Sequence, residues 1–306
     1  MRKNCIYNLA ACLAAAFLPV MAGAAPQPKT DLHDLNMYAI DNDPPVRLLR
    51  YSFYSETYTV IADLIDQHGD TPIDLEAICY IPSGPDKGFY APSNRNHYDK
   101  PAILYKIEPL TGDCYKYDND IGYPYVVGMV AVQTAPGVWS ILATQSGGDD
   151  KALILIDPAT GVGTEIIALS NTYEGLAMAR DGTLYGMALD SDDDSQLFII
   201  DPSSGSETNL GPAMDRGRIE SLEFAFGEVV DAIDTNGLVP PSWTMNGVLM
   251  GFSDGENEFV IINPLNGDMV PYAPPFLEGT TTDGEGLALF TLRQDPYSAV
   301  LSNVFD

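Results

Sequence analysis

Four glutamates stand at equivalent places in short apolar segments of this 306-residue chain, and they are the side chains best suited to do chemistry. They open the segments Glu76-Ala77-Ile78, Glu174-Gly175-Leu176, Glu220-Ser221-Leu222 and Glu285-Gly286-Leu287. Carboxylates that are brought together repel one another unless one takes up a proton or a metal ion bridges them. Calcium is the ion favoured for such a cluster, because it accepts an irregular cage of many oxygen ligands. The chemistry therefore depends on whether the fold gathers these four side chains.

A second repeated motif shows which elements lie between the glutamates. In each copy an acidic or amide residue precedes a proline, a glycine follows three residues later, and apolar runs flank the motif: Glu108–Gly112, Asp157–Gly161, Asp201–Gly205 and Asn263–Gly267. The polar side chain caps such a turn, proline fixes φ, and glycine takes the left-handed conformation that closes the turn. Each copy therefore predicts a tight connection between two antiparallel strands.

The two motifs alternate along the chain. The glutamates 174, 220 and 285 follow the preceding turn proline by 16, 18 and 21 residues, and Val127-Gly128-Met129 fits a fifth copy, 18 residues after Pro109. After Glu174, Asp181-Gly182 supplies a further hairpin turn. One unit thus contains four strands: the glutamate strand, a second strand, a third strand that runs into the proline turn, and a fourth strand after it. This pattern is that of a β-propeller blade.

The spacing of the turn prolines, 49, 44 and 62 residues, predicts an all-β propeller of five four-stranded blades, with six blades as the alternative. We expect the strand near Glu285 to close the ring by pairing with strands between residues 35 and 62, including 48–53 and 57–61. Such closure removes the exposed edges of an open sheet. The predicted domains are a secretory signal at 1–24, a flexible leader at 25–34 and a single propeller at 35–306.

The repeats resemble those of propeller families that combine an Asp-Pro-x-Thr-Gly turn, a Glu-Gly-Leu strand and an Asp-Gly-x-Leu-Tyr segment, here Asp181–Tyr185. Such families include the gluconolactonase-like, NHL-like and phytase-like esterase propellers, and the resemblance covers about residues 48 to 290. It implies the fold, whereas these families range from lactonases and phosphoesterases to pure binding modules. The lactonase-like metal site of glutamate, amides and aspartate cannot be placed in full here, and a phytase-like ladder of aspartates is not evident.

In propellers of this type the innermost strand begins on the face that carries the loops between second and third strands. We therefore expect Glu76, Glu174, Glu220 and Glu285 to converge at the mouth of the central channel and to hold a calcium ion. The alternative is that each glutamate only caps a turn in its own blade. Three of the loops on this face are rich in acidic residues, which fits either a cation site or a solvated acidic surface: 147–150, 190–195 and 253–258.

The corresponding loop of the first complete blade has a different composition. It contains Asn94, Arg95, Asn96, His97 and Tyr98. Amide, cationic and aromatic groups beside acidic neighbours are suited to orienting a polar ligand, and an ordinary exposed loop is the alternative. An insertion at 231–246, with Trp243, lies by the same topology on the opposite face. Its tryptophan either contacts a partner or packs against its own blade.

The charge of the chain excludes some partners. It has 43 acidic and 15 basic residues, a formal net charge of −28, so a nucleic acid or an anionic membrane surface would be repelled. Arg2 and Lys3 precede an apolar run at 9–23 that ends in small residues, which predicts export to the periplasm or the extracellular space. A lipid-anchoring cut at Cys12 is disfavoured, because the apolar run continues after it.

No membrane span is expected after the signal. The uncharged stretch 121–148 contains Pro136-Gly137 between two β-branched runs, which predicts a hairpin. Cys79 and Cys114 fall on the inner and outer strands of one blade, about 14 Å apart at three strand spacings. A disulfide requires less than about 7 Å between Cα atoms, so we expect none.

Recognised catalytic motifs are lacking, and His33, His68 and His97 are the only histidines, so a histidine-based triad is disfavoured. The sequence favours an exported binding or scaffolding module that has calcium at the channel mouth and binds a protein or a small polar or cationic ligand. The alternative is a metal-dependent hydrolase of lactones or phosphoesters, in which the ion polarises an oxygen and activates water.

Overall fold

The computed structural model describes residues 35–42, 44–53, 55–72, 74–94, 100–146, 151–189, 194–212, 218–226, 230, 240–243, 246–253, 258–272 and 284–291. The chain divides into two units, residues 1–30 and 31–306, and all described residues belong to the second. The predicted signal and leader therefore lie outside the described residues. No helix in the described ranges is long and apolar enough to cross a membrane.

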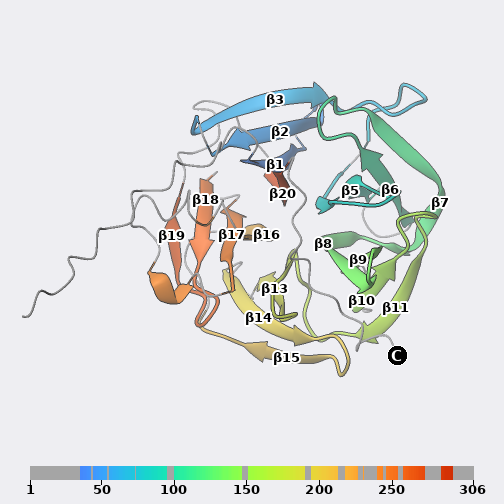
Figure 1. The fold of residues 1–306 in the computed structure, drawn as a ribbon. Coiled ribbons are helices and arrows are strands. Elements are labelled where there is room, and N and C mark those ends of the chain that lie inside the picture. Colours follow the sequence, from blue (N-terminus) through green and yellow to red (C-terminus); the bar gives the residue numbers. More distant parts are fainter. Residues whose placement is uncertain are drawn as a thin grey trace, which may run out of the picture. The chain divides into compact units, whose positions relative to one another are not determined.

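Five four-stranded antiparallel sheets, the blades, make up the described part of the second unit (Figure 1). Blade 1 consists of β20 (Gly284–Thr291), β1 (Leu35–Asp41), β2 (Arg47–Ser52) and β3 (Thr57–Asp63). Blade 2 consists of β4 (Cys79–Ile81), β5 (Gly88–Ser93), β6 (Pro101–Ile107) and β7 (Cys114–Pro124). Blade 3 consists of β8 (Val126–Ala135), β9 (Val138–Gln145), β10 (Ala152–Ile156) and β11 (Gly163–Ala168).

Blade 4 consists of β12 (Gly175–Met178), β13 (Leu184–Leu189), β14 (Ser195–Asp201) and β15 (Ser206–Asn209). Blade 5 consists of β16 (Ile219–Ala225), β17 (Val248–Ser253), β18 (Glu258–Ile262) and β19 (Met269–Pro271). The blades stand around a common centre, with β3, β7, β11, β15 and β19 at the rim (Figure 1). The prediction of a five-bladed β-propeller is confirmed, and the six-bladed alternative is wrong.

Blade 1 closes the ring as the sequence predicted. The last strand, β20, pairs with β1 from Leu35↔Thr291 to Asp41↔Gly284, and β1 in turn pairs with β2. Blade 1 thus takes its inner strand from the end of the described chain and its other three strands from the start. The 121–148 stretch also follows prediction: β8 and β9 form a hairpin whose turn contains Gly137 at φ +75°.

The proline turns form by local hydrogen bonding, as their residue types require. Asp157 Oδ1 accepts from the Ala159 amide at 3.0 Å, its Oδ2 accepts from the Thr160 hydroxyl at 2.7 Å, and the Gly161 amide donates to the Asp157 carbonyl at 2.8 Å. Gly161 has φ +76°, the left-handed conformation expected of it. The Asp201 turn repeats this pattern, and hydrogen bonds from the Ser204 and Ser203 hydroxyls lower the pKa of Asp201 to about 2.

Five hydrophobic clusters hold the blades together, one at each junction between neighbouring blades. The alternation of side chains along a strand explains this arrangement. In β1, Met37 and Ala39 pack toward blade 5, whereas Tyr38 and Ile40 pack toward blade 2. Both faces of such a strand are buried, which explains its nearly continuous apolar sequence.

Two predictions about single residues are resolved by this packing. Cys79 on β4 and Cys114 on β7 are both buried and free, as expected from their strands. Trp243, in the short 3-10 helix η2 (Pro241–Trp243), packs against the cluster between blades 5 and 1, which favours the packing alternative for this side chain. Asn246 donates to Asp181 Oδ2 at 2.6 Å, so this end of the insertion lies beside a first-to-second-strand turn, on the predicted face.

Candidate functional site

Each inner strand begins beside the end of the second strand of its own blade. In blade 2, Leu75 bridges Ser93; in blade 5, Ile219 pairs with Ser253; in blade 1, Gly284 pairs with Asp41. The start of each inner strand and the loops between second and third strands therefore share one face. This is the face on which the sequence predicted that the glutamates converge.

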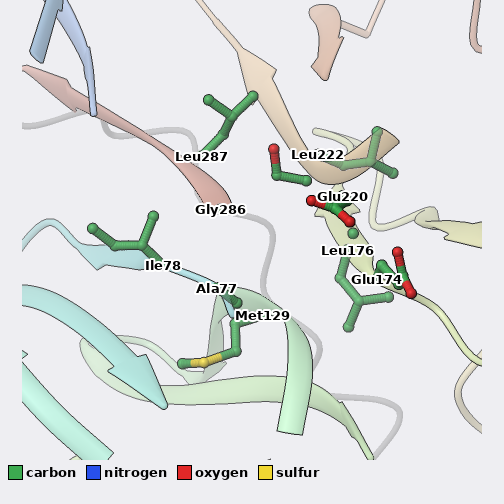
Figure 2. Close-up of a pocket in the computed structure, with 11 residues that line it drawn as sticks. Ala77, Ile78, Met129, Glu174, Leu176, Glu220, Leu222, Gly286 and Leu287 are labelled. Atoms are coloured by element: carbon green, nitrogen blue, oxygen red, sulfur yellow. The ribbon is translucent and has the colours of Figure 1, made fainter. Parts of the chain in front are cut away.

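The glutamate motifs of all five blades line one small cavity where the inner strands meet (Figure 2). Its walls are formed by Ala77, Ile78, Met129, Glu174, Gly175, Leu176, Glu220, Ser221, Leu222, Gly286 and Leu287. The cavity volume is about 10 Å³, which is room for about one water molecule. Among the described residues, the motifs therefore leave room for one small group between the inner strands.

The middle residue of the motif is small because the inner strands approach one another very closely. A Cβ on Gly175 would lie 2.8 Å from the Leu222 amide nitrogen, and one on Gly286 would lie 2.4 Å from the Ile78 amide nitrogen. Contacts below 3.0 Å with backbone atoms cannot be relieved by a side-chain rotation. The glycine of the Glu-Gly-Leu motif is thus needed for closing a ring of five blades. The glutamate is the residue of the motif whose side chain is suited to bind a ligand.

A bulge directs Glu220 toward the mouth. Ile219 pairs with Ser253 and Ser221 pairs with Phe252, so Glu220 is the extra residue opposite a continuous partner strand. Such a bulge re-aims a side chain relative to a regular strand. The same irregularity recurs in blade 1, where Gly286, at φ +66°, is the extra residue of β20.

Arg218 joins the glutamates of blades 4 and 5. One of its terminal nitrogens lies 3.1 Å from Glu174 Oε1 and 3.0 Å from Glu220 Oε1. The side chains of Glu174 and Glu220 are only 16% and 6% exposed, whereas that of Arg218 is 44% exposed. The arginine therefore covers the two carboxylates from the solvent side and offsets part of their repulsion. Sequence reasoning missed Arg218, although a cation two residues before Glu220 was a usable signal.

Glu76 comes to the same site from blade 2 in a different charge state. Burial, a hydrogen bond with Asp74 and the negative charges of Asp74, Glu220 and Glu174 together raise the pKa of Glu76 to about 9. At neutral pH this carboxyl therefore keeps its proton and is hydrogen-bonded to Asp74. Asp74 has φ +59°, a conformation that asparagine and aspartate tolerate better than most residues. Asp74 is the second residue at the site that sequence reasoning missed.

Three of the four predicted glutamates thus influence one another at the mouth, and two of them line the cavity. The backbone of Glu285 lies in β20 opposite Ile40, and its side chain is outside the described residues. Among described residues, no group of three histidine, cysteine, aspartate or glutamate side chains is arranged to hold a metal ion. The carboxylates as placed, with Arg218 against two of them and a proton on a third, do not form a calcium cage. Calcium stays a prediction, because Glu285 could complete the site.

The predicted ligand loop is described only at its first residue. Asn94 is 1% exposed, and its side-chain amide makes two hydrogen bonds of 2.9 Å with the backbone of Val126 in the next blade. Arg95, Asn96, His97 and Tyr98 lie outside the described residues, as do most residues of the three acidic loops. The prediction that this loop binds a ligand stays a prediction, and Asn94 itself links two blades.

Asn94 belongs to a repeated set of polar side chains near the junction of second and third strands. In four blades such a side chain bonds to the backbone where the next blade's inner strand begins: Asn42 to Leu75, Asn94 to Val126, Thr144 to Tyr173 and Ser195 to Ile219. These bonds fix the start of four of the five inner strands. They therefore position the motif glutamates around the mouth.

No family model and no curated sequence matches the chain. Solved structures that this chain resembles include a chain of a nidogen/laminin complex, at 8% identity, TM-score 0.48, and coverage of 84% of this chain and 98% of that one. The chain is a β-propeller. TolB from Acinetobacter baumannii matches at 13% identity, TM-score 0.45, and coverage of 80% of this propeller and 54% of TolB.

A gluconolactonase from Xanthomonas campestris is a further structural neighbour of this propeller. It shares 11% identity at a TM-score of 0.41, over 80% of this chain and 78% of the enzyme. Such a likeness carries no conclusion about binding or catalysis.

Proposed function

We propose that this protein is an exported binding module that takes up a cationic group at the mouth of its central channel. The observation that carries the proposal is the convergence of Glu174 and Glu220 on one cavity. The Glu76 carboxyl lies near enough for both of their charges to raise its pKa. Two ionised carboxylates, one arginine and a protonated Glu76 leave the site with a net negative charge. A cation is the ligand that such a site attracts.

The size of the cavity among the described residues fits the binding of a small group. A space for about one water-sized particle admits an ion or the end of a side chain, whereas a hydrolase needs an open pocket beside its metal for the substrate. Calcium, the ion predicted from the sequence, would bind here if Arg218 moved off Glu174 and Glu220 and if Glu285 supplied further oxygens. Calcium binding would then displace the arginine and the proton of Glu76, and it would be favoured by high pH.

Thermal unfolding of the purified protein with calcium chloride, or with a chelator, tests this proposal. A ligand that binds only the native state at about 100 times its Kd stabilises the fold by about 2.7 kcal/mol. The shift should be lost in Glu174→Gln and retained in Glu165→Gln, which removes a charge from an exposed position on the outer strand β11. If neither calcium nor any organic cation shifts the transition, the cationic-ligand proposal is wrong.

Metal-dependent hydrolysis is the second candidate, and the charge states at the mouth favour it in one respect. A protonated Glu76 beside ionised Glu174 and Glu220 is the type of arrangement that supplies a general acid and a general base. A panel of lactones and phosphoesters, assayed with calcium, tests this alternative. Turnover that disappears in Glu76→Gln would favour the hydrolase over the binding module.

A further inference from the structure

Ser221 is a buried polar group at the mouth that the fold leaves without a hydrogen-bond partner. It is 3% exposed, it lines the cavity, and its hydroxyl oxygen bonds to no group among the described residues. A buried hydroxyl without a partner costs about 1 to 3 kcal/mol, so a ligand that satisfies it gains that amount on binding. Alanine at the equivalent position of blade 2, Ala77, shows that the ring closes without a hydroxyl here.

The three hydrogen-bond acceptor groups around the cavity match the three N–H donors of a primary ammonium group. Two carboxylates and a hydroxyl line the cavity: Glu174 directly precedes β12, and Glu220 and Ser221 lie in β16 of the next blade. A carboxylate has about four lone-pair positions, so both glutamates can accept further hydrogen bonds while they hold Arg218. A primary ammonium group carries three N–H donors on one compact nitrogen, and that nitrogen occupies about the space of one water molecule.

The walls of the cavity also suit the first methylene group next to an ammonium nitrogen, and the rest of the alkyl chain would lie outside the cavity. Its remaining walls are mainly aliphatic, with Ile78, Met129 and Leu287 across from the two carboxylates (Figure 2). Methylene groups attached to an ammonium pack well on such surfaces while the charged end reaches polar groups. A guanidinium group is planar and larger, and the one that the site accommodates, from Arg218, lies on the solvent side.

We propose that the cavity at the channel mouth binds a primary alkylammonium group through Glu174, Glu220 and Ser221. This inference rests on the proposed function and specifies its ligand. The group is either a free small amine or a lysine side chain of a partner protein, since both present the same ammonium on an alkyl stem. Glu76 and Asp74 flank the site from blade 2, and Arg218 flanks it from blade 5.

Isothermal titration of the full protein at pH 7 tests the inference with four probes: n-butylammonium, N-acetyl-lysine amide, tetramethylammonium and calcium. The first two should bind saturably, and tetramethylammonium, which has the charge but no N–H donor, should bind at least about tenfold more weakly. Tighter binding of N-acetyl-lysine amide would indicate a lysine of a partner as the natural ligand. Preference for butylammonium would indicate a free amine.

Two variants separate the specific site from general attraction to an acidic surface. Ser221→Ala should weaken the binding of butylammonium about tenfold, which is the effect of one hydrogen bond to a charged group. It should leave folding intact. Glu165→Gln, on the outer strand, should leave the affinity unchanged. Equal binding of tetramethylammonium, or full affinity in Ser221→Ala, would overturn the inference.

The titration with calcium distinguishes failure of this inference from failure of the proposed function. If calcium binds and loses affinity in Glu174→Gln while the primary amines do not bind, the mouth is a cation site and the ammonium inference is wrong. If no probe binds, both proposals are wrong, and the carboxylates have only a structural role with Arg218.

Discussion

The guanidinium of Arg218 in blade 5 lies 3.1 Å from the carboxylate of Glu174 in blade 4. This contact bridges two blades at the channel mouth, and the same guanidinium also contacts Glu220 of its own blade. Arg218 therefore does two things at once. It offsets repulsion between two poorly exposed carboxylates, and it competes with any cation that the mouth would bind.

Replacement of Arg218 by glutamine should destabilise the protein and increase its affinity for cations. Because the arginine side chain is 44% exposed, we expect a loss of about 1 kcal/mol from the free energy of unfolding. The two carboxylates then lose their internal cation, so n-butylammonium or calcium should bind more tightly than in the wild type. Urea unfolding and titration calorimetry measure the two effects. Arg218→Lys keeps the charge and is the matched control; tighter binding in both variants would contradict the competition.

The proton on Glu76 should make stability depend on pH. The folded-state pKa is raised above the ordinary value of 4.5, to about 9, so the stabilisation it confers is complete below pH 4.5 and is lost as the pH rises toward 9. Glu76→Gln mimics the neutral form at every pH. The variant should therefore unfold at a higher temperature than the wild type at pH 9, and the difference should shrink toward pH 5. A difference that is independent of pH would mean that Glu76 is ionised at neutral pH.

Glu207 connects blades 3 and 4 and should be a strong determinant of stability. Its carboxylate accepts hydrogen bonds from Asn171 Nδ2 and the Tyr173 hydroxyl, both at 2.6 Å, and also from the amides of Ser170 and Asn171. Burial acts to raise the pKa of Glu207, and these four hydrogen bonds outweigh it and lower the pKa.

Glu207→Ala should cost about 2 kcal/mol, since it leaves several donors without their acceptor. The contribution of Glu207 is present above the ordinary glutamate pKa and is lost as the pH falls through the lowered folded-state value, so the difference from wild type should shrink in acid. Urea unfolding at pH 7 and at pH 3 measures the loss of stability at neutral pH and its decrease in acid. Glu165→Ala, on the neighbouring outer strand β11, should cost little at either pH.

Patterns that act within a few residues were predictable from the sequence. The proline turns depend on side chains such as Asp157 that bond to the next residues along the chain, and the blade count follows from how often those turns recur. Arg218 and Asp74 were not predictable in the same way. Their positions depend on a bulge at Glu220 and on a left-handed backbone at Asp74, and the spacing of the repeats shows neither.

The small middle residue of the glutamate motif should be required for closing the ring. In Gly175→Ala the new Cβ would lie 2.8 Å from two backbone atoms of the next blade, at Ser221 and Leu222, and neither atom can move without shifting β16. Overpacking of this kind costs about 1 to 3 kcal/mol. Ser221→Ala is the matched control one blade further on: it removes atoms and adds none, and the hydroxyl that it removes has no partner among the described residues, so it should not lower stability. Chemical unfolding of both variants tests this; equal stability would mean that the inner strands can separate, and that the cavity can open wider than its single-particle size suggests.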